Sequence, residues 1–134
     1  MKSLFEFKTE IPFDLNVFEC MKKIAVESLS GTEKNQHTQA IVLFSTAGNK
    51  YSAIIKNALS KERLDEKALL EKLKIANDTE IRYILCMWQD NGIDIPSYNF
   101  REMLCELNHE NKKSLIFVMT KYGVSLIELS ATMK

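Results

Sequence analysis

Two short stretches of this chain are apolar on both faces of an extended backbone, and this feature constrains the fold more than any other. The first, within 38–46, contains Ile41, Val42, Leu43 and Phe44 in succession. In the second, 81–88, Ile81, Tyr83, Leu85 and Met87 alternate with Arg82, Ile84, Cys86 and Trp88. Strands of this kind lie inside a sheet and need cover on each face. We therefore predict a mixed α/β (α+β) domain whose central mixed sheet has about five or six strands, covered by about three helices.

The remaining elements follow from periodicity and turn residues, and nothing divides 1–134 into more than one domain. Alternating residues predict a first strand at 3–11. Helices are expected at 15–29, capped by Asp14, at 60–75, capped by Ser60, and from Ser97 to about 108. The second helix is expected to turn Leu64, Ala68, Leu69 and Leu73 toward the core. Gly48-Asn49 and Tyr122-Gly123 predict hairpins joining 38–46 to 51–57 and 114–120 to 124–130.

Charge and hydropathy exclude several classes of function. Lys plus Arg and Asp plus Glu both number 18, so the chain lacks the positive field that binds nucleic acid directly. Its apolar runs are much shorter than the roughly 20 residues of a membrane helix. The first residues carry charges where a signal peptide is apolar. We expect a cytoplasmic protein with no direct nucleic-acid or membrane partner.

Motifs for catalysis, metal binding or phosphate binding are missing from the sequence. Each of the four glycines is isolated, so no phosphate-binding loop is present. The histidines, His37 and His109, belong to no metal-ligand pair. Three widely spaced cysteines, without a CxxC pair, are expected to be reduced and mostly buried. We therefore predict no catalytic residue, no metal site and no cofactor.

Acidic residues are expected to be solvated or to form turns. The pairs Asp65-Glu66 and Glu102/Glu106 lie on predicted solvent faces of helices, with no apolar pocket to raise a carboxyl pKa. Asp90-Asn91-Gly92-Ile93-Asp94 resembles the start of a calcium loop but lacks the further ligands that calcium requires. Asn-Gly is also a common turn signal, so we predict a turn there.

The segment 78–110 is acidic although the chain is neutral. It holds seven acidic and two basic residues, and it also contains the only tryptophan, Trp88. Aromatic side chains beside like charges are typical of protein interfaces, where the charges steer an oppositely charged partner. The alternative is that Trp88 packs in the core and the acids are only solvated. The predicted partner-binding residues are Trp88, Asp90, Asp94, Tyr98, Glu102 and Glu106.

This segment also carries a resemblance to a known family. Through Trp88-Gln89-Asp90, Ile93-Asp94-Ile95-Pro96-Ser97 and the run 100–108, the chain resembles the immunity proteins of bacterial contact-dependent growth inhibition systems. Those are small cytoplasmic α/β domains without an active-site motif. The resemblance implies a non-catalytic inhibitor that binds and blocks a cognate toxin, such as a basic nuclease domain. It covers about a third of the chain and transfers no functional residue.

Two other classes of function stay open at the level of sequence. One is a small enzyme whose site is assembled from dispersed residues, such as Cys105, His109 and Glu106 or the carboxylates near Asp90. It predicts a pocket with converging polar groups. The other is a homodimeric module in which the strand at 124–130 pairs across a two-fold axis, leaving the oligomeric state undetermined.

Overall fold

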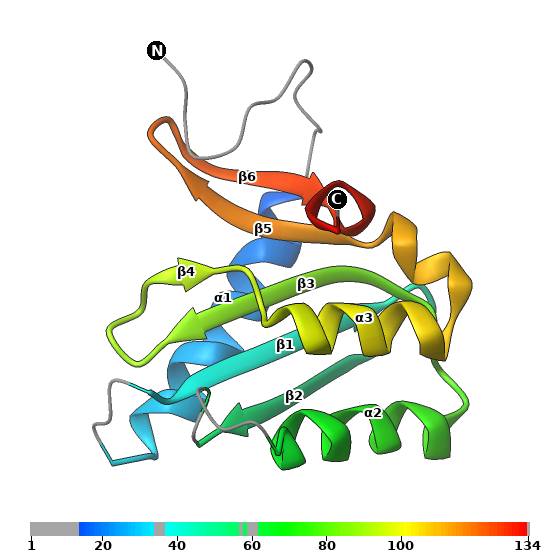
Figure 1. The fold of residues 1–134 in the computed structure, drawn as a ribbon. Helices are drawn as coiled ribbons and strands as arrows, with labels where there is room; N and C mark the ends of the chain where they lie inside the picture. Colours follow the sequence, from blue (N-terminus) through cyan, green and yellow to red (C-terminus); the bar gives the residue numbers. More distant parts are fainter. Residues whose placement is uncertain (1–13, 34–36, 57, 59–61, 134) are drawn as a thin grey trace.

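The computed structural model describes residues 14–33, 37–56, 58 and 62–133 (Figure 1). The predicted strand at 3–11 lies outside these residues. The described elements, in chain order, are α1 (Leu15–Ser30), β1 (Gln39–Ser45), β2 (Lys50–Ile55), α2 (Leu64–Ala76), β3 (Ile81–Trp88), β4 (Ile93–Asp94), α3 (Tyr98–Leu107), η1 (His109–Lys113), β5 (Leu115–Thr120), β6 (Gly123–Glu128) and η2 (Leu129–Thr132). The predicted class, a mixed sheet with three α-helices, is confirmed for this part of the chain.

The sheet is mixed because one of its pairings is parallel. Its strand order is β2-β1-β3-β5-β6, and β4 pairs with β3 beside this path. β3 and β5 are parallel, whereas every other recorded pair of neighbours is antiparallel. The helix α3 makes the crossover between the two parallel strands, as a parallel connection requires. The expected pairing of β6 with a second copy of the chain is untested and stays a prediction.

Helices cover both faces of the sheet, as the two apolar strands require. The helix α1 packs against one face, where it buries Phe18, Met21, Ala25 and Leu29 against Val42, Leu85 and Phe117. The other face carries α2 and α3, and its core includes Ile41, Ile84, Leu69 and Phe100 (Figure 1). Because side chains alternate along β3, Trp88 shares the face of Ile84 and Cys86. That face is the one covered by α2 and α3.

Local signals set most of the boundaries correctly. Asp14 caps α1, accepting a hydrogen bond from the Asn16 amide at 2.8 Å. Ser97 caps α3 and accepts from the Phe100 amide at 3.1 Å. Gly48 and Gly123 take positive φ in the two hairpin turns, +92° and +115°, a conformation that costs glycine little. None of the helices in the described ranges is long and apolar enough to cross a membrane.

The second helix differs from its prediction in start and in orientation. Ser60 lies outside the described residues, and the residue at the N-cap is Arg63, in the left-handed region at φ 57°. Leu64 is 65% exposed and Ala68 is also exposed, so neither faces the core. The buried residues are Glu66, Leu69, Leu70 and Leu73. These four keep helical spacing, and the rotated stripe brings a carboxylate inside.

Candidate functional site

Trp88 is the last residue of β3 and is half-buried. It is therefore neither fully exposed, as a binding surface would have it, nor sealed in the core. Part of its ring packs against the core on the side of α2 and α3. Its indole Nε1 donates a hydrogen bond to Asp94 Oδ2 at 2.9 Å. The tryptophan is therefore held in a fixed orientation while part of its surface stays in contact with solvent.

The two aspartates near Trp88 are exposed, but both also hold the β3–β4 turn together. Asp90 Oδ1 accepts from the Gly92 amide at 2.9 Å, and Asp94 Oδ1 accepts from the Ile95 amide at 2.7 Å. Asn91 takes φ 69° in the same turn. The turn predicted for 90–94 is present at its start, but Ile93 and Asp94 form β4. The two carboxylates therefore stabilise the hairpin and also give it negative charge.

The three predicted residues on α3 lie four positions apart, on one side of the helix. Tyr98 is 52% exposed, and Glu102 and Glu106 are exposed too. The Arg101 guanidinium lies 5.6 Å from the centre of the Tyr98 ring, within the range of a cation–π contact. No hydrogen bond in the described part of the chain involves the Glu102 or Glu106 carboxylate.

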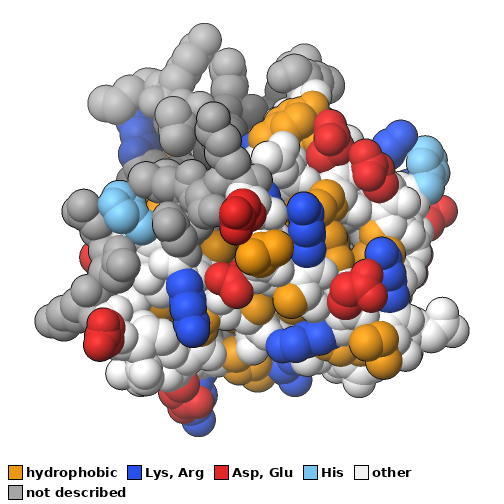
Figure 2. Space-filling view, turned by 60° about the horizontal axis from the view of Figure 1, so that its bottom comes forward, with side chains coloured by type: hydrophobic (Ala, Val, Ile, Leu, Met, Phe, Trp, Pro, Cys, Tyr) orange, Lys and Arg blue, Asp and Glu red, His pale blue; other side chains and the backbone are white. Residues whose placement is uncertain are grey.

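Among the six predicted surface residues the structure shows one direct contact, and the surroundings of these residues are not uniformly acidic. Trp88 and Asp94 are adjacent, and Tyr98 follows Asp94 at the start of α3, whereas Asp90 stands in the hairpin turn. Figure 2, which shows the side on which α2 lies, has Lys and Arg side chains interspersed with Asp and Glu. An electrostatic attraction for a basic partner would therefore be confined to the immediate neighbourhood of the acidic side chains. The binding role of these six residues stays a prediction.

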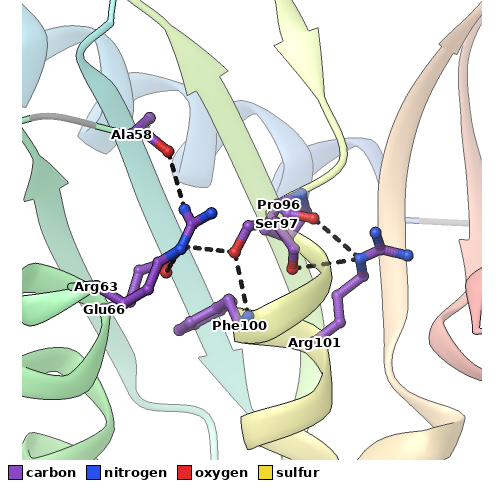
Figure 3. A network of polar contacts seen from close by, with 7 residues as sticks. All are labelled: Ala58, Arg63, Glu66, Pro96, Ser97, Phe100 and Arg101. Atoms are coloured by element: carbon purple, nitrogen blue, oxygen red, sulfur yellow. Dashed lines mark hydrogen bonds and ion pairs between the residues drawn. The ribbon is translucent and has the colours of Figure 1, made fainter. Parts of the chain in front are cut away.

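A second group of polar residues lies where the N-termini of α2 and α3 meet (Figure 3). Ser97 Oγ donates to Glu66 Oε2 at 3.0 Å. The Arg63 Nε atom lies 3.7 Å from Glu66 Oε1, and its Nη1 donates to the Ala58 carbonyl at 2.8 Å. Arg101 donates from Nε to the Pro96 carbonyl at 2.9 Å. These contacts join the segment before α2, both helix starts and the loop before α3.

Glu66 was predicted to be solvated, and the structure contradicts this prediction. The residue is 1% exposed. Burial raises the pKa of its carboxyl, and nearby Asp65 raises it further, while the Ser97 hydrogen bond and the charge of Arg63 act in the opposite direction. The prediction was wrong because the buried stripe of α2 runs through Leu69, Leu70 and Leu73 with Glu66, and not through Leu64 and Ala68.

The alternative of a Cys105–His109–Glu106 site finds no support in the geometry. His109 is exposed and Cys105 is half-buried against the core. Burial raises the pKa of the Cys105 thiol, which disfavours the reactive thiolate. No hydrogen bond joins the three side chains in the part of the chain that the structure describes. A groove of about 650 Å³ lies between α2 and α3 and is lined by Glu106 together with apolar residues such as Met103 and lysines such as Lys74, but its lining includes neither Cys105 nor His109.

The comparisons with known proteins identify the fold. No family model and no curated protein matches the chain. Solved structures do match: cytidine deaminase from Mycobacterium leprae has a TM-score of 0.64 at 16% identity, covering 87% of this chain and 96% of that one. The enzyme from Mycobacterium tuberculosis gives 0.61 at 13%, covering 90% and 94%. That from Burkholderia pseudomallei gives 0.61 at 13%, covering 84% and 93%.

This chain has a cytidine deaminase-like fold. The resemblance to the immunity proteins of contact-dependent growth inhibition was therefore wrong, because the likeness to cytidine deaminases extends over about nine-tenths of the chain and not over one acidic third. Aromatic and acidic residues in one segment are common to many proteins and do not identify a family. At these identities the likeness establishes the fold alone.

The fold raises the question of zinc, because zinc deaminases carry the signature H-x-E followed by P-C-x-x-C. The order of that pattern is present here, as Leu64-Asp65-Glu66 and Pro96-Ser97-Tyr98-Asn99-Phe100. The glutamate and the proline of the pattern are present. The three positions that would supply zinc ligands hold Leu64, Ser97 and Phe100 instead, and the last is fully buried in the core.

Within the described residues, no other side chains replace the missing ligands. All five cysteines and histidines of the sequence fall within the described residues, and no group of three His, Cys, Asp or Glu side chains there could hold a metal ion. Leucine and phenylalanine offer no donor atom. The residues present do not fit zinc. The Glu66–Ser97 contact could not be predicted from the sequence. Its only signal is the order of the deaminase signature, and the metal-binding residues by which that signature is recognised are absent here.

Proposed function

We propose that this domain binds a basic protein partner through its acidic-aromatic surface, which consists of Trp88, Asp90, Asp94, Tyr98, Glu102 and Glu106. It does so on a deaminase-like fold without carrying out zinc-dependent deamination. The proposal rests on one observation. Leu64, Ser97 and Phe100 occupy the three positions of the signature at which a zinc deaminase has its metal ligands.

The geometry of the surface supports binding. Trp88 is oriented by its hydrogen bond to Asp94, so little side-chain entropy is lost when a partner covers it. Tyr98 offers a second partly exposed aromatic ring. Large aromatic side chains of this kind supply most of the binding energy in many interfaces.

The charges around these rings suggest the chemistry of the partner. Glu102 and Glu106 are exposed, and their carboxylates have no hydrogen-bond partner within the described ranges. They are thus available to basic side chains, and exposed charges of this kind accelerate association at low salt. In its specific form, the proposal is that the partner is a basic toxin domain and that binding blocks it.

The test compares one charge-reversal variant with a matched control. The immobilised domain is exposed to extract of its native cell, and the captured protein is identified and purified. Glu102→Lys/Glu106→Lys should then slow association with that protein by about tenfold or more at low salt, with a smaller effect at high salt. These two positions are chosen because reversing Asp90 or Asp94 would also break the hairpin bonds.

The control is Glu19→Lys/Glu27→Lys, which changes the net charge equally. Both residues are exposed on α1, on the opposite face of the sheet (Figure 1). This variant should associate as the unaltered domain does. Equal slowing by the two variants would contradict the surface assignment, and so would a captured partner that is acidic.

A further inference from the structure

The N-termini of α2 and α3 contribute the two halves of the deaminase signature, and in this chain they are still joined. In a zinc deaminase the ligands come from both halves, so the metal ion links the two helix starts. Here the recorded link is the hydrogen bond from Ser97 Oγ to Glu66 Oε2, which spans 31 positions of sequence. The second oxygen of Glu66 takes no part in it.

That second oxygen faces a cation. Glu66 Oε1 and Arg63 Nε are both buried, and neither has a hydrogen-bond partner within the described residues. They lie 3.7 Å apart, with the side chains 1% and 20% exposed respectively. A buried carboxylate is costly unless a positive charge lies beside it. Arg63 is that charge.

Arg63 adopts a conformation that needs an explanation. Its φ of 57° places a long side chain in the left-handed region, which costs a non-glycine residue of its type about 1 kcal/mol. The conformation lets the guanidinium donate to the Ala58 carbonyl at 2.8 Å and lie against Glu66. These contacts compensate for the backbone cost.

We propose that the Arg63 guanidinium replaces the zinc ion as the cation at the junction of α2 and α3, and that this junction is held without metal. Arg63 neutralises Glu66, which holds Ser97, and Ser97 caps α3 through the Phe100 amide. Arg63 is therefore a positioning residue for the helix that carries Tyr98, Glu102 and Glu106. The inference holds whether or not the domain binds a protein.

A test of the Glu66 charge by pH must take account of the titratable and polar groups that face this carboxyl. At the start of α2 these are Arg63 and Asp65, on β3 the buried thiol of Cys86, and before α3 the Ser97 hydroxyl. Burial raises the pKa of the Cys86 thiol, so that this group stays neutral at ordinary pH. Arg63 is the positive charge among these groups.

The first experiment measures zinc directly. The purified domain is incubated with excess Zn²⁺, dialysed, and analysed for metal, and its melting temperature is then recorded with and without a chelator. We expect much less than one zinc ion per chain and the same melting temperature in both cases. One zinc ion per chain, together with a melting temperature that falls on chelation, would overturn the proposal.

The second experiment is a double-mutant cycle with Arg63→Met and Glu66→Gln, followed as melting temperature against pH. Methionine keeps a Cβ at the same φ, so the backbone cost is unchanged and only the charge and its donors are lost. Arg63→Met should lower the melting temperature by about 5–10 °C near neutral pH. The loss should shrink in acid, where Glu66 becomes protonated, and should be smaller when Glu66→Gln is also present.

The control is the exposed ion pair Lys74–Glu71, which has the same spacing of three residues. Lys74→Met should change the melting temperature little at any pH. If Arg63→Met lowers the melting temperature equally at all pH values and regardless of Glu66→Gln, then Arg63 acts only by packing. That outcome would overturn its role as the cation of the junction.

Discussion

Ser97 donates its hydroxyl to Glu66 at 3.0 Å while accepting from the Phe100 amide at 3.1 Å. A single side chain thus caps α3 and satisfies one oxygen of a buried carboxylate on α2. Glu66 matches the glutamate of the deaminase signature, whereas Ser97 stands at the position of a cysteine ligand in that signature.

Removing this hydroxyl should cost more than removing an ordinary cap. Ser97→Ala loses the cap and leaves Glu66 Oε2 without its donor, so we expect a loss of about 2–3 kcal/mol in the free energy of unfolding. Asp14→Ala removes the exposed cap of α1 and should cost about 1 kcal/mol. Urea unfolding of the two variants checks the difference, and equal losses would contradict the role of Glu66. Ser97→Thr, which keeps a hydroxyl, should restore most of the stability.

The pH dependence of stability has two components of opposite sign. Glu66 has a folded pKa above its usual 4.5, so the folded state binds its proton more tightly than the unfolded state. Its contribution is therefore greatest in acid and declines as the pH rises from about 4.5 through the folded pKa. Glu66→Gln should remove this decline in a series of unfolding measurements. A decline unchanged in the variant would assign it to another group.

Asp78 should act in the opposite direction. Burial tends to raise its carboxyl pKa, but hydrogen bonds from Asn49, Ser45 and Tyr51 outweigh burial, and the pKa lies below its usual 3.8. The stability that it contributes is present above about pH 4 and is lost as the pH falls through the folded pKa. Asp78→Asn should therefore flatten the acid side of the stability profile. The exposed carboxylate variant Glu19→Gln is the control and should leave that side unchanged.

Trp88 is the only tryptophan of the chain, so its fluorescence reports on the acidic-aromatic surface alone. Asp94→Ala removes the acceptor of the indole N–H, and the freed ring should become more accessible to acrylamide and emit at longer wavelength. Asp90→Ala breaks the other aspartate bond of the hairpin without touching the indole, and its spectrum should stay close to that of the unaltered domain. Identical spectra for all three proteins would show that Asp94 does not orient Trp88.

Much of the fold could be predicted because its signals are local. The alternation in Ile81–Trp88 gave the bounds of β3, and the caps Asp14 and Ser97 placed the starts of two helices. Even the sheet class followed from two strands that are apolar on both faces. The two residues of β4 are too few to show any periodicity, and that strand was missed.

The site could not be predicted because it depends on tertiary contacts. Arginine is a poor candidate for an N-cap at positive φ, and only its contacts with Ala58 and Glu66 hold it there. A glutamate beside Asp65 at a helix start is normally solvated, since the helix dipole already favours it. The burial of Glu66 became visible only when α2 was seen packed against the sheet.

We propose that this domain, although its fold is deaminase-like, does not perform zinc-dependent deamination. The most direct test follows ammonia release from cytidine by the purified domain supplied with Zn²⁺, beside Glu66→Gln. We predict no release above that of a buffer control, for either protein. Turnover by the unaltered domain that Glu66→Gln abolishes would contradict the account, because Glu66 would then act as a catalytic acid and base.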